Sequence, residues 1–491
     1  DPALRQQLAR ALLELGDVYR RVGDPEAALV PIASAVEALD GDDSGAARTI
    51  AASGRSARAA ALLALGAPGL SAAATEAEEA WQPLLADADS GPTARAALVR
   101  LALMQARLAL DAPDGLDEAQ RQLGRAADLL ADSPAADETL ADERCGLSIH
   151  EGLLQLQREP FEQALATFER AGEALTDELR ERRPELVARQ LLGVATACSK
   201  LRRFGPAEAA LAAADEAIRD AVERFPNDIT VRRTLASVRL QRATLDVLRR
   251  DHPAAIASLG EALAIWRQLF LSNDPVPRDQ HAFAVACAQL GNCHLLTRPP
   301  AAEPARRSYE EAETVLQRLL DAAPGTVPYL TELGATLNGL AAWENTFGDP
   351  AEARAYALRA IDVQQRAYAM RPEALRIRNF LGIHHAQLAF AEQACGDREA
   401  ALASARKAVA HAPALPGPVR MSVQTAIRCA DELAADGHAA AAEAVYAESV
   451  RWLRELASAP LRNVAPFLRG SAFAALHQRE DFRQLLAEVE R

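Results

Sequence analysis

Residues 340–361, LAAWENTFGDPAEARAYALRAI, contain a phrase that the chain repeats with small changes. Variants of its second half are GDPEAAL at 23–29, FGPAEAAL at 204–211 and GDREAAL at 396–402. Such a phrase is a catalytic loop, a ligand-binding loop or a structural joint, and the surrounding residues decide between these.

The residues of FGDPAEA, 347–353, are typical of a turn between two helices. We expect Gly348 to end one helix in the left-handed conformation and Asp349 to cap the next. Pro350 suits the first helical position, where its missing N–H is not needed, and Glu352 lies where the helix dipole favours a carboxylate. Because each residue has a structural role, the phrase is predicted to be a joint.

A stripe of small residues follows each turn, at positions spaced i, i+4 and i+7, which share one face of a helix. The first position is Ala28, Ala164, Ala210, Ala255, Ala305, Ala353 or Ala401, and the third is Ala35, Ala171, Ala217, Ala262, Ala312, Ala360 or Ala408. Between them stand Ile32, Phe168, Leu259 or Tyr309 in four copies and alanine in the others. Small residues on either side of a larger one predict the close approach of a neighbouring helix.

A second helical pattern precedes each turn. In the first copy it consists of Leu12, Leu15, Gly16 and Tyr19, and in later copies of Cys287, Leu290, Gly291 and His294, and of Leu337, Leu340, Ala341 and Glu344. We expect the small residue after leucine where two helices cross most tightly. Each unit is therefore predicted to be helix, short turn, helix.

The positions Leu12, Leu15, Gly16, Tyr19, Ala28, Ile32 and Ala35 resemble the tetratricopeptide repeat. The spacing is longer, because 48 residues separate Leu340 from Leu388 and 50 separate Leu290 from Leu340, against ~34 in the standard repeat. A surplus of about 14 residues, at ~3.6 per turn, predicts helices longer by one or two turns. Longer linkers are expected as well, such as 269–280 and 320–330.

The array from 226 to 491 resembles the C-terminal region of large bacterial serine/threonine protein kinases, through RNFLGIHHAQLAFAEQACGDREAALASARKAV at 378–409 and the ending REDFRQLLAEVER. This resemblance implies a regulatory region attached to a kinase domain. The kinase motifs G-x-G-x-x-G, V-A-I-K, H-R-D and D-F-G are not in the sequence, so we expect no catalysis from this chain.

The predicted fold is all-α, a right-handed superhelical solenoid of antiparallel helix pairs with a C-terminal capping helical segment. We expect three parts: 1–133, with irregular repeats from 41; 134–412, with the long-period repeats; and 413–491, the cap. A chain of 491 residues exceeds the size at which single cores stop growing, which agrees with a repeat array. The sequence starts within the pattern and without Met, so we expect it to be part of a longer protein.

Composition excludes several classes of function. The net charge of −14 and the scattered arginine pairs disfavour nucleic acid as a partner. No apolar run approaches the ~20 residues of a membrane span, so we expect no membrane insertion and a cytoplasmic location. The six cysteines lie far apart and are predicted to be reduced and buried. No cofactor or metal is expected, because Cys287 and His294, the ends of the nearest ligand-like cluster, lie ~10 Å apart along a helix.

Function in such an array moves to its concave surface, which the first helix of each pair is expected to line. The candidate binding residues there are Gln289, Asn292, Asn338, Asn345, Gln387 and Gln393. Amide side chains both donate and accept hydrogen bonds, as the backbone of a bound peptide requires. The predicted partner is a protein or peptide, while ordinary polar surface, a self-associating scaffold and a small-molecule sensor remain as alternatives.

Overall fold

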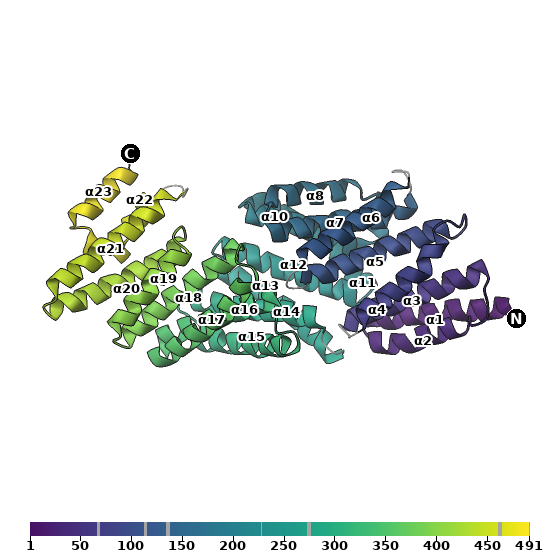
Figure 1. Ribbon diagram of the computed structural model, residues 1–491, viewed down its shortest axis with the longest axis horizontal. Helices are drawn as coiled ribbons and strands as arrows, with labels where there is room; N and C mark the ends of the chain where they lie inside the picture. The colour runs from purple at the N-terminus through teal and green to yellow at the C-terminus, as the bar shows by residue number, and fades with distance from the viewer. Residues whose placement is uncertain are drawn as a thin grey trace. The chain divides into compact units, whose positions relative to one another are not determined.

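The computed structural model describes residues 1–65, 69–111, 115–133, 138–226, 228–272, 276–459 and 464–490. These residues form helices α1 to α23 and three short 3-10 helices, η1 to η3, and no strand occurs among them. Figure 1 shows the helices following one another as antiparallel hairpins. The prediction of an all-α array of helix pairs is confirmed.

The chain divides into two compact units, Asp1–Ala286 and Cys287–Arg491. The three parts expected from the sequence stay a prediction, and the expected boundary at 134 falls on residues 134–137, outside the described part.

The described part of the first unit contains six helix pairs. Their first helices are α1 (Pro2–Val22), α3 (Gly45–Leu65), α5 (Gly91–Asp111), α7 (Ala141–Arg158), α10 (Pro184–Lys200) and α12 (Ile229–Leu248). Their second helices are α2 (Pro25–Glu37), α4 (Leu70–Trp81), α6 (Leu116–Ala131), α8 (Phe161–Glu173), α11 (Phe204–Arg224) and α13 (His252–Ser272). The short elements η1 (Gln82–Leu84), η2 (Glu138–Leu140) and α9 (Asp177–Arg182) lie between pairs.

Helix α14 (Pro277–Leu296) crosses the boundary, and the second unit continues with α15 (Ala302–Ala322). Three pairs follow: α16 (Val327–Phe347) with α17 (Pro350–Met370), α18 (Leu375–Ala394) with α19 (Arg398–His411), and α20 (Pro416–Ala435) with α21 (Ala439–Ser458). The unit ends with α22 (Ala465–Leu468), η3 (Ser471–Leu476) and α23 (Glu480–Val489).

The turn between α16 and α17 forms as predicted except at Gly348. Asp349 caps α17 by accepting the N–H of Ala351 at 2.8 Å, and Pro350 begins that helix. Gly348 has φ −122°, so the prediction of a left-handed conformation is wrong. The Glu344 carboxylate, which accepts the N–H of Asp349 at 3.1 Å, lies in the space that a Cβ on Gly348 would take, so a larger residue would displace that side chain.

The alanine stripes are the buried faces of the second helices. Ala353 and Ala360 are fully buried, as are their counterparts in the other copies except α11. There the alignment is wrong by three residues, because Ala217 is only half-buried while Ala207 and Ala214 are fully buried. The physical reason is that α11 already begins at Phe204, so the glycine used for the alignment lies inside its first turn.

The large residue of a stripe packs against glycines of two successive first helices. Phe168 of α8 lies between Gly152 of α7 and Gly193 of α10, where an added Cβ would stand 2.7 Å and 2.3 Å from the phenyl ring. Tyr309 of α15 lies in the same way against Gly291 of α14, at 2.7 Å from an added Cβ. The predicted tight crossing at this glycine is therefore confirmed.

Long helices account for the long repeat. Helices α15, α16 and α17 have 21 residues each. The predicted long linker at 320–330 is wrong, because only residues 323–326 separate α15 from α16. In the predicted linker 269–280, residues 269–272 belong to α13, and 273–275 lie outside the described part.

The C-terminal helices close the second unit. Leu453 of α21, Phe473 of η3 and Phe482 of α23 are fully buried in one core, which confirms a helical cap. Arg479 ties the last helix down, since its guanidinium contacts Glu443 of α21 at 2.7 Å and Asp481 of α23 at 3.0 Å.

Helix α13 is long and apolar enough over His252–Leu271 to cross a membrane by length and composition alone, a feature that the sequence reading did not identify. The core helix of a folded domain meets the same test. Ala255, Leu259, Ala262 and Trp266 of α13 are buried within the first unit.

Candidate functional site

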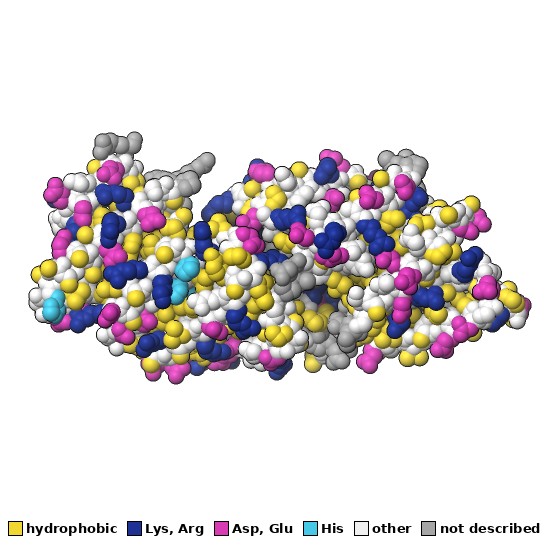
Figure 2. Space-filling view, viewed as in Figure 1, with side chains coloured by type: hydrophobic (Ala, Val, Ile, Leu, Met, Phe, Trp, Pro, Cys, Tyr) yellow, Lys and Arg dark blue, Asp and Glu magenta, His cyan; other side chains and the backbone are white. Residues whose placement is uncertain are grey.

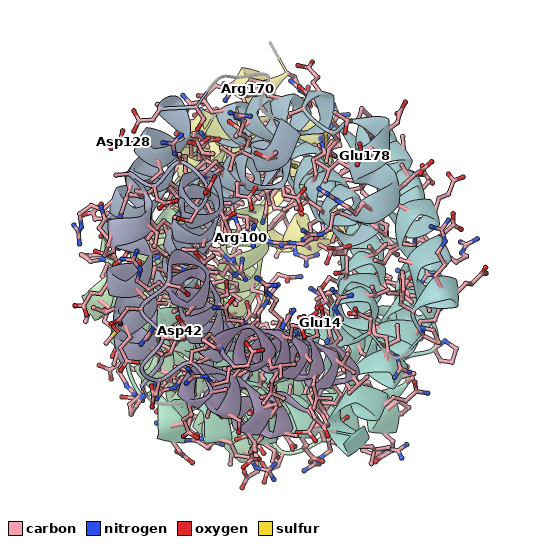
Figure 3. All side chains as sticks on the ribbon, turned by 90° about the vertical axis from the view of Figure 1, so that its right-hand side faces the viewer. Glu14, Asp42, Arg100, Asp128, Arg170 and Glu178 are labelled. Carbon is pink, nitrogen blue, oxygen red and sulfur yellow. The ribbon has the colours of Figure 1, made fainter. Side chains whose placement is uncertain are left out.

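The first helices form the inner layer of the first unit. Each contacts the first helix of the next pair, from α1 through α3, α5, α7 and α10 to α12, and α12 contacts α1 again. In the end-on view of Figure 3, Arg100 of α5 and Glu14 of α1 lie beside the central opening. Asp128 of α6 and Arg170 of α8 lie toward the rim. The six first helices thus close a turn and present one face inward.

Charge is sorted between the two layers of this unit. The six first helices carry 18 Arg and Lys residues and eight Asp and Glu residues. The six second helices carry six Arg and Lys residues and 17 Asp and Glu residues. In the second unit the first helices α16, α18 and α20 carry four Arg and Lys residues and five Asp and Glu residues. A basic inner layer is therefore a property of the first unit rather than of the repeat.

The charges of arginines from three other helices act on His150 of α7. Its Nδ1 donates a hydrogen bond to the Gly146 carbonyl at 2.7 Å, so the neutral ring keeps Nε2 as an acceptor. Burial and then the positive charges of three arginines lower the pKa of His150 to about 3. These are Arg189 of α10, Arg107 of α5 and Arg278 of α14. Burial and the charge of Arg107 also lower the pKa of Arg189 to about 10. Positive potential is concentrated here, and it favours an anionic group.

Sequence reasoning missed this cluster. The arginines look scattered in the sequence because they are spread over many helices, and no run of basic residues marks them. The signal lies in the alternation of charge between first and second helices, which becomes visible once the helix pairs have been assigned.

A hollow of about 590 Å³ opens on α1, α3 and the segment before α5. Leu13 and Ile50 supply apolar lining, and Arg10, Glu14 and Asp87 supply charges of both signs. The inner surface is thus mixed in charge where the unit begins, and the arginines that act on His150 lie further along, on α5, α10 and α14.

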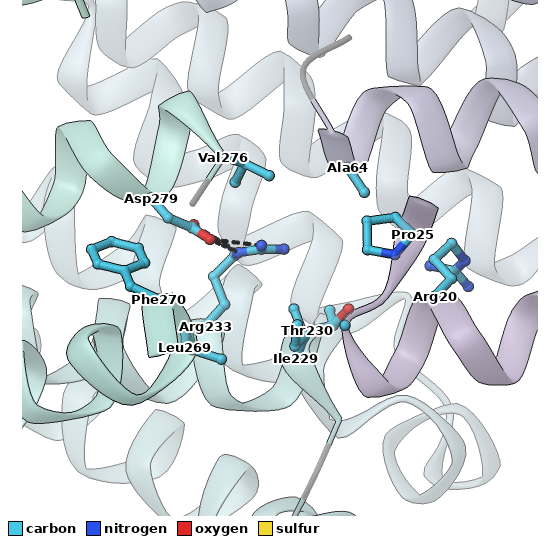
Figure 4. A pocket seen from close by; sticks show the side chains of 11 residues that line it. Arg20, Pro25, Ala64, Ile229, Thr230, Arg233, Leu269, Phe270, Val276 and Asp279 are labelled. Atoms are coloured by element: carbon cyan, nitrogen blue, oxygen red, sulfur yellow. Dashed lines mark hydrogen bonds and ion pairs between the residues drawn. The ribbon is translucent and has the colours of Figure 1, made fainter. Parts of the chain in front are cut away.

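A smaller cavity of about 60 Å³ lies where the start of the first unit meets its last helices (Figure 4). Arg20 and Pro25 line one side of it, and Arg233 and Asp279 the other. Arg233 Nε lies 2.7 Å and 2.8 Å from the two carboxylate oxygens of Asp279. This largely buried ion pair holds α12 to α14 beside the seam of the turn.

The six predicted amide residues all lie on first helices of the second unit, two each on α14, α16 and α18. Two of them have partners inside the fold: Asn292 accepts a hydrogen bond from Tyr309 Oη at 2.8 Å, and Gln393 donates one to Glu432 of α20 at 2.8 Å. Gln387 is buried and Gln289 half-buried. A binding role for these residues stays a prediction.

Asn338 and Asn345 of α16 differ from the other four. The Oδ1 of Asn338 and both amide atoms of Asn345 are shielded from solvent and have no hydrogen-bond partner among the described residues. Seven residues apart, they face the same side of the helix, ~10 Å from each other. Buried polar groups are normally hydrogen-bonded, so these amides have hydrogen-bonding capacity that no described residue uses, and neighbouring side chains must move before a ligand reaches it.

A related group lies between α16, α17 and α18. Gln364 Oε1 and both ring nitrogens of His384 are buried and also lack partners within the described part of the chain. An added Cβ on Gly334 would stand 2.9 Å from this Gln364 oxygen and 3.2 Å from His384 Nε2. Glycine here leaves space beside two polar atoms, which suits a bound water.

The remaining surface offers little chemistry. Figure 2 shows Lys and Arg interspersed with Asp and Glu over the visible face, which agrees with the many exposed ion pairs. Over the described ranges, His, Cys, Asp and Glu side chains do not gather in threes as metal ligands would. Five cysteines are buried, as expected, and Cys395 is exposed.

No protein-family model matches the chain, and no curated protein matches it. Solved structures that resemble it include a Rap protein complexed with competence and sporulation factor, with a TM-score of 0.45 and 15% identity over 83% of this chain and 99% of that one. A STAND signal-transduction ATPase with a tetratricopeptide repeat sensor, from Pyrococcus horikoshii, has a TM-score of 0.42 and 14% identity over 87% of this chain and 53% of that one. A tetratricopeptide protein of Thermus thermophilus has a TM-score of 0.24 and 16% identity over 52% of this chain and 98% of that one. At these scores the fold rests on the helices described above.

Proposed function

We propose that this chain is a protein-interaction module that binds an extended polypeptide along the first helices of its array. The observation that supports this most is the pair of unsatisfied amides on α16. Asn338 and Asn345 face one side, and each can both donate to and accept from a peptide backbone. A fold that served only as a spacer would gain nothing from burying them.

Selection from a random-peptide display library against the full chain tests the proposal. Enriched peptides are expected to bind more weakly, by about tenfold, when Asn338→Leu or Asn345→Leu removes one hydrogen-bonding partner, which corresponds to about 1.4 kcal/mol. Gln365→Leu is the matched control, because Gln365 is an exposed amide on the second helix α17. Peptides that bind all variants equally would overturn the role of α16.

The resemblance of 226–491 to the C-terminal regions of bacterial serine/threonine kinases supports a narrower proposal. In it, the module is cytoplasmic and recruits substrates or partners for an attached kinase, and contributes no catalytic group itself. Co-purification of a phosphorylated partner with the full-length protein, lost in Asn338→Leu, is the expected result.

One observation favours self-association as a second candidate. Leu4, Leu8, Leu15, Val18 and Val22 of α1 are exposed, with 43% to 64% of each residue accessible. Their spacing forms an apolar stripe along the helix. Light scattering of the chain and of a Leu8→Glu/Leu15→Glu variant tests this, and a monomer in both would exclude it.

A further inference from the structure

We propose that the inner surface of the first unit binds an acidic polypeptide segment. The inference deepens the proposed function, on which it rests for the polypeptide nature of the partner, but it concerns a different unit and different residues. The sorting of charge between layers and the closure of the turn carry it, and the arginine charges that act on His150 support it.

Part of the inner positive charge serves to hold the two layers together. Arg58, Arg158 and Arg239 reach outward to ion pairs with Glu76, Asp117 and Asp215 of second helices. Arg233 is likewise paired, with Asp279 of α14. With these four set aside, 14 Arg and Lys residues stand on the first helices against eight Asp and Glu residues. The inner layer therefore keeps a large positive excess.

The distribution of this excess favours an extended ligand over a small anion. Apart from the arginines in these ion pairs, helix α3 carries Arg48 and Arg55 and no acidic residue, and α12 carries Arg232 and Arg242 and one aspartate. The cluster of Arg107 and Arg189 lies on other helices, α5 and α10. A chain of carboxylates passing through the turn would meet positive charge on several helices in succession, whereas a single phosphate would meet only one group.

Nucleic acid fits this surface poorly. Aromatic side chains on which bases stack are almost missing from the inner layer, since Tyr19 is the one Phe, Tyr or Trp in the six first helices. The second helices around them carry 17 acidic residues against six basic ones. This outer charge would repel a long polyanion at both ends of the turn, whereas a short acidic stretch within an otherwise neutral polypeptide avoids that repulsion.

Arg189 is the residue to test. It is half-buried on α10, and its pKa is lowered by burial and by Arg107, so its charge is held at a cost in free energy that an anionic ligand would offset. Replacing it by glutamine keeps the polarity of the side chain and removes the charge. We expect Arg189→Gln to fold with an unchanged or higher melting temperature.

The experiment measures fluorescence anisotropy of a labelled peptide of alternating Glu and Gly against the full chain. Peptides of Gln and Gly and of Lys and Gly, an oligo-dT strand and inorganic phosphate as a competitor serve as comparisons. The acidic peptide is expected to bind, and Arg107→Gln/Arg189→Gln to weaken it about tenfold or more, since two charge contacts are lost. Arg121→Gln/Arg224→Gln is the matched control, because both arginines are exposed on second helices.

Binding of the acidic peptide by the inner double variant as tightly as by the wild type would overturn the proposal, as would tighter binding of oligo-dT or full competition by phosphate. If the double variant does not fold, hydrogen exchange of the wild type decides: the acidic peptide must protect α5 and α10 and leave α6 and α11 unchanged. Asn338→Leu, in the second unit, is expected to leave acidic-peptide binding intact. The two experiments therefore distinguish a failure of the amide site on α16 from a failure of the basic inner surface of the first unit.

Discussion

The phenyl ring of Phe168 and the Cα of Gly193 belong to successive helix pairs and touch so closely that a Cβ on Gly193 would stand 2.3 Å from ring carbon Cε1. Phe168 is fully buried at this point. The contact locks α8 against the first helix of the next pair, α10. It sets the distance between neighbouring pairs and so contributes to the closure that brings α12 back to α1.

Gly193→Ala is expected to destabilise the first unit by about 1–3 kcal/mol, the usual cost of overpacking a filled core. Gly205→Ala is the control, because a Cβ there meets nothing within 4 Å and alanine favours a helix by about 1 kcal/mol. Thermal unfolding followed by circular dichroism measures both. Equal melting temperatures for the two variants would contradict the packing account.

Acid should destabilise the second unit through its buried histidines. Burial, followed by the neighbouring His385, lowers the pKa of His384 to about 3. Burial, followed by the charges of His411 and Lys407, lowers the pKa of His385 to about 4. In the unfolded chain both histidines take up protons as the pH falls below their ordinary pKa of ~6.5, whereas in the folded state they stay neutral. Stability is therefore complete above that pH and falls as the pH drops, by about 2 kcal/mol per histidine at pH 5.

Denaturant unfolding at neutral pH and at pH 5 measures this loss. His384→Leu is expected to reduce it, and His438→Gln, at an exposed position, is expected to leave it unchanged. A pH dependence that is the same in His384→Leu and in the wild type would show that other groups cause the acid sensitivity.

Arg479→Gln should release the C-terminal helix. The Arg479 guanidinium joins Glu443 of α21 to Asp481 of α23, and its hydrogen bond lowers the pKa of the Asp481 carboxyl. We expect a loss of about 1 kcal/mol and faster hydrogen exchange in α23. Arg483→Gln, on the exposed face of the same helix, should exchange at the wild-type rate.

Buried amides with and without partners should respond differently to removal. Gln190 Nε2 donates to the Phe168 carbonyl at 2.7 Å, so Gln190→Leu removes a buried hydrogen bond and is expected to cost about 1 kcal/mol. Asn345→Leu removes amide atoms that have no partner among the described residues and should not lower the melting temperature. If Asn345→Leu is as destabilising as Gln190→Leu, its amide has a structural role and the proposed binding role fails.

Local chemistry was predictable from the sequence because it depends on adjacent residues. Asp349 caps α17 with its carboxylate, and Pro350 occupies the first helical position, as their side chains predict. Gly348 was not predictable, because its conformation depends on the Glu344 carboxylate, which folds back over it from the preceding turn. The register of α11 was missed because glycine is not confined to turns, and Gly205 lies inside the helix.

The candidate sites divide in the same way. Helix periodicity placed Asn338 and Asn345 on a first helix, but only the packing of the unit shows that their amides lack partners among the described residues. The arginines around His150 come from α5, α10 and α14, which are far apart in the sequence. Their meeting depends on the closure of the turn, which periodicity does not determine.

Partners are proposed to bind on the first-helix side of the array. Hydrogen–deuterium exchange of the full chain, measured with and without a selected peptide, tests it most directly. We expect protection confined to first helices, such as α16 and α18 or α5 and α10, with α17, α19, α6 and α11 unchanged. Protection confined to the second helices, or none at a saturating peptide concentration, would contradict it.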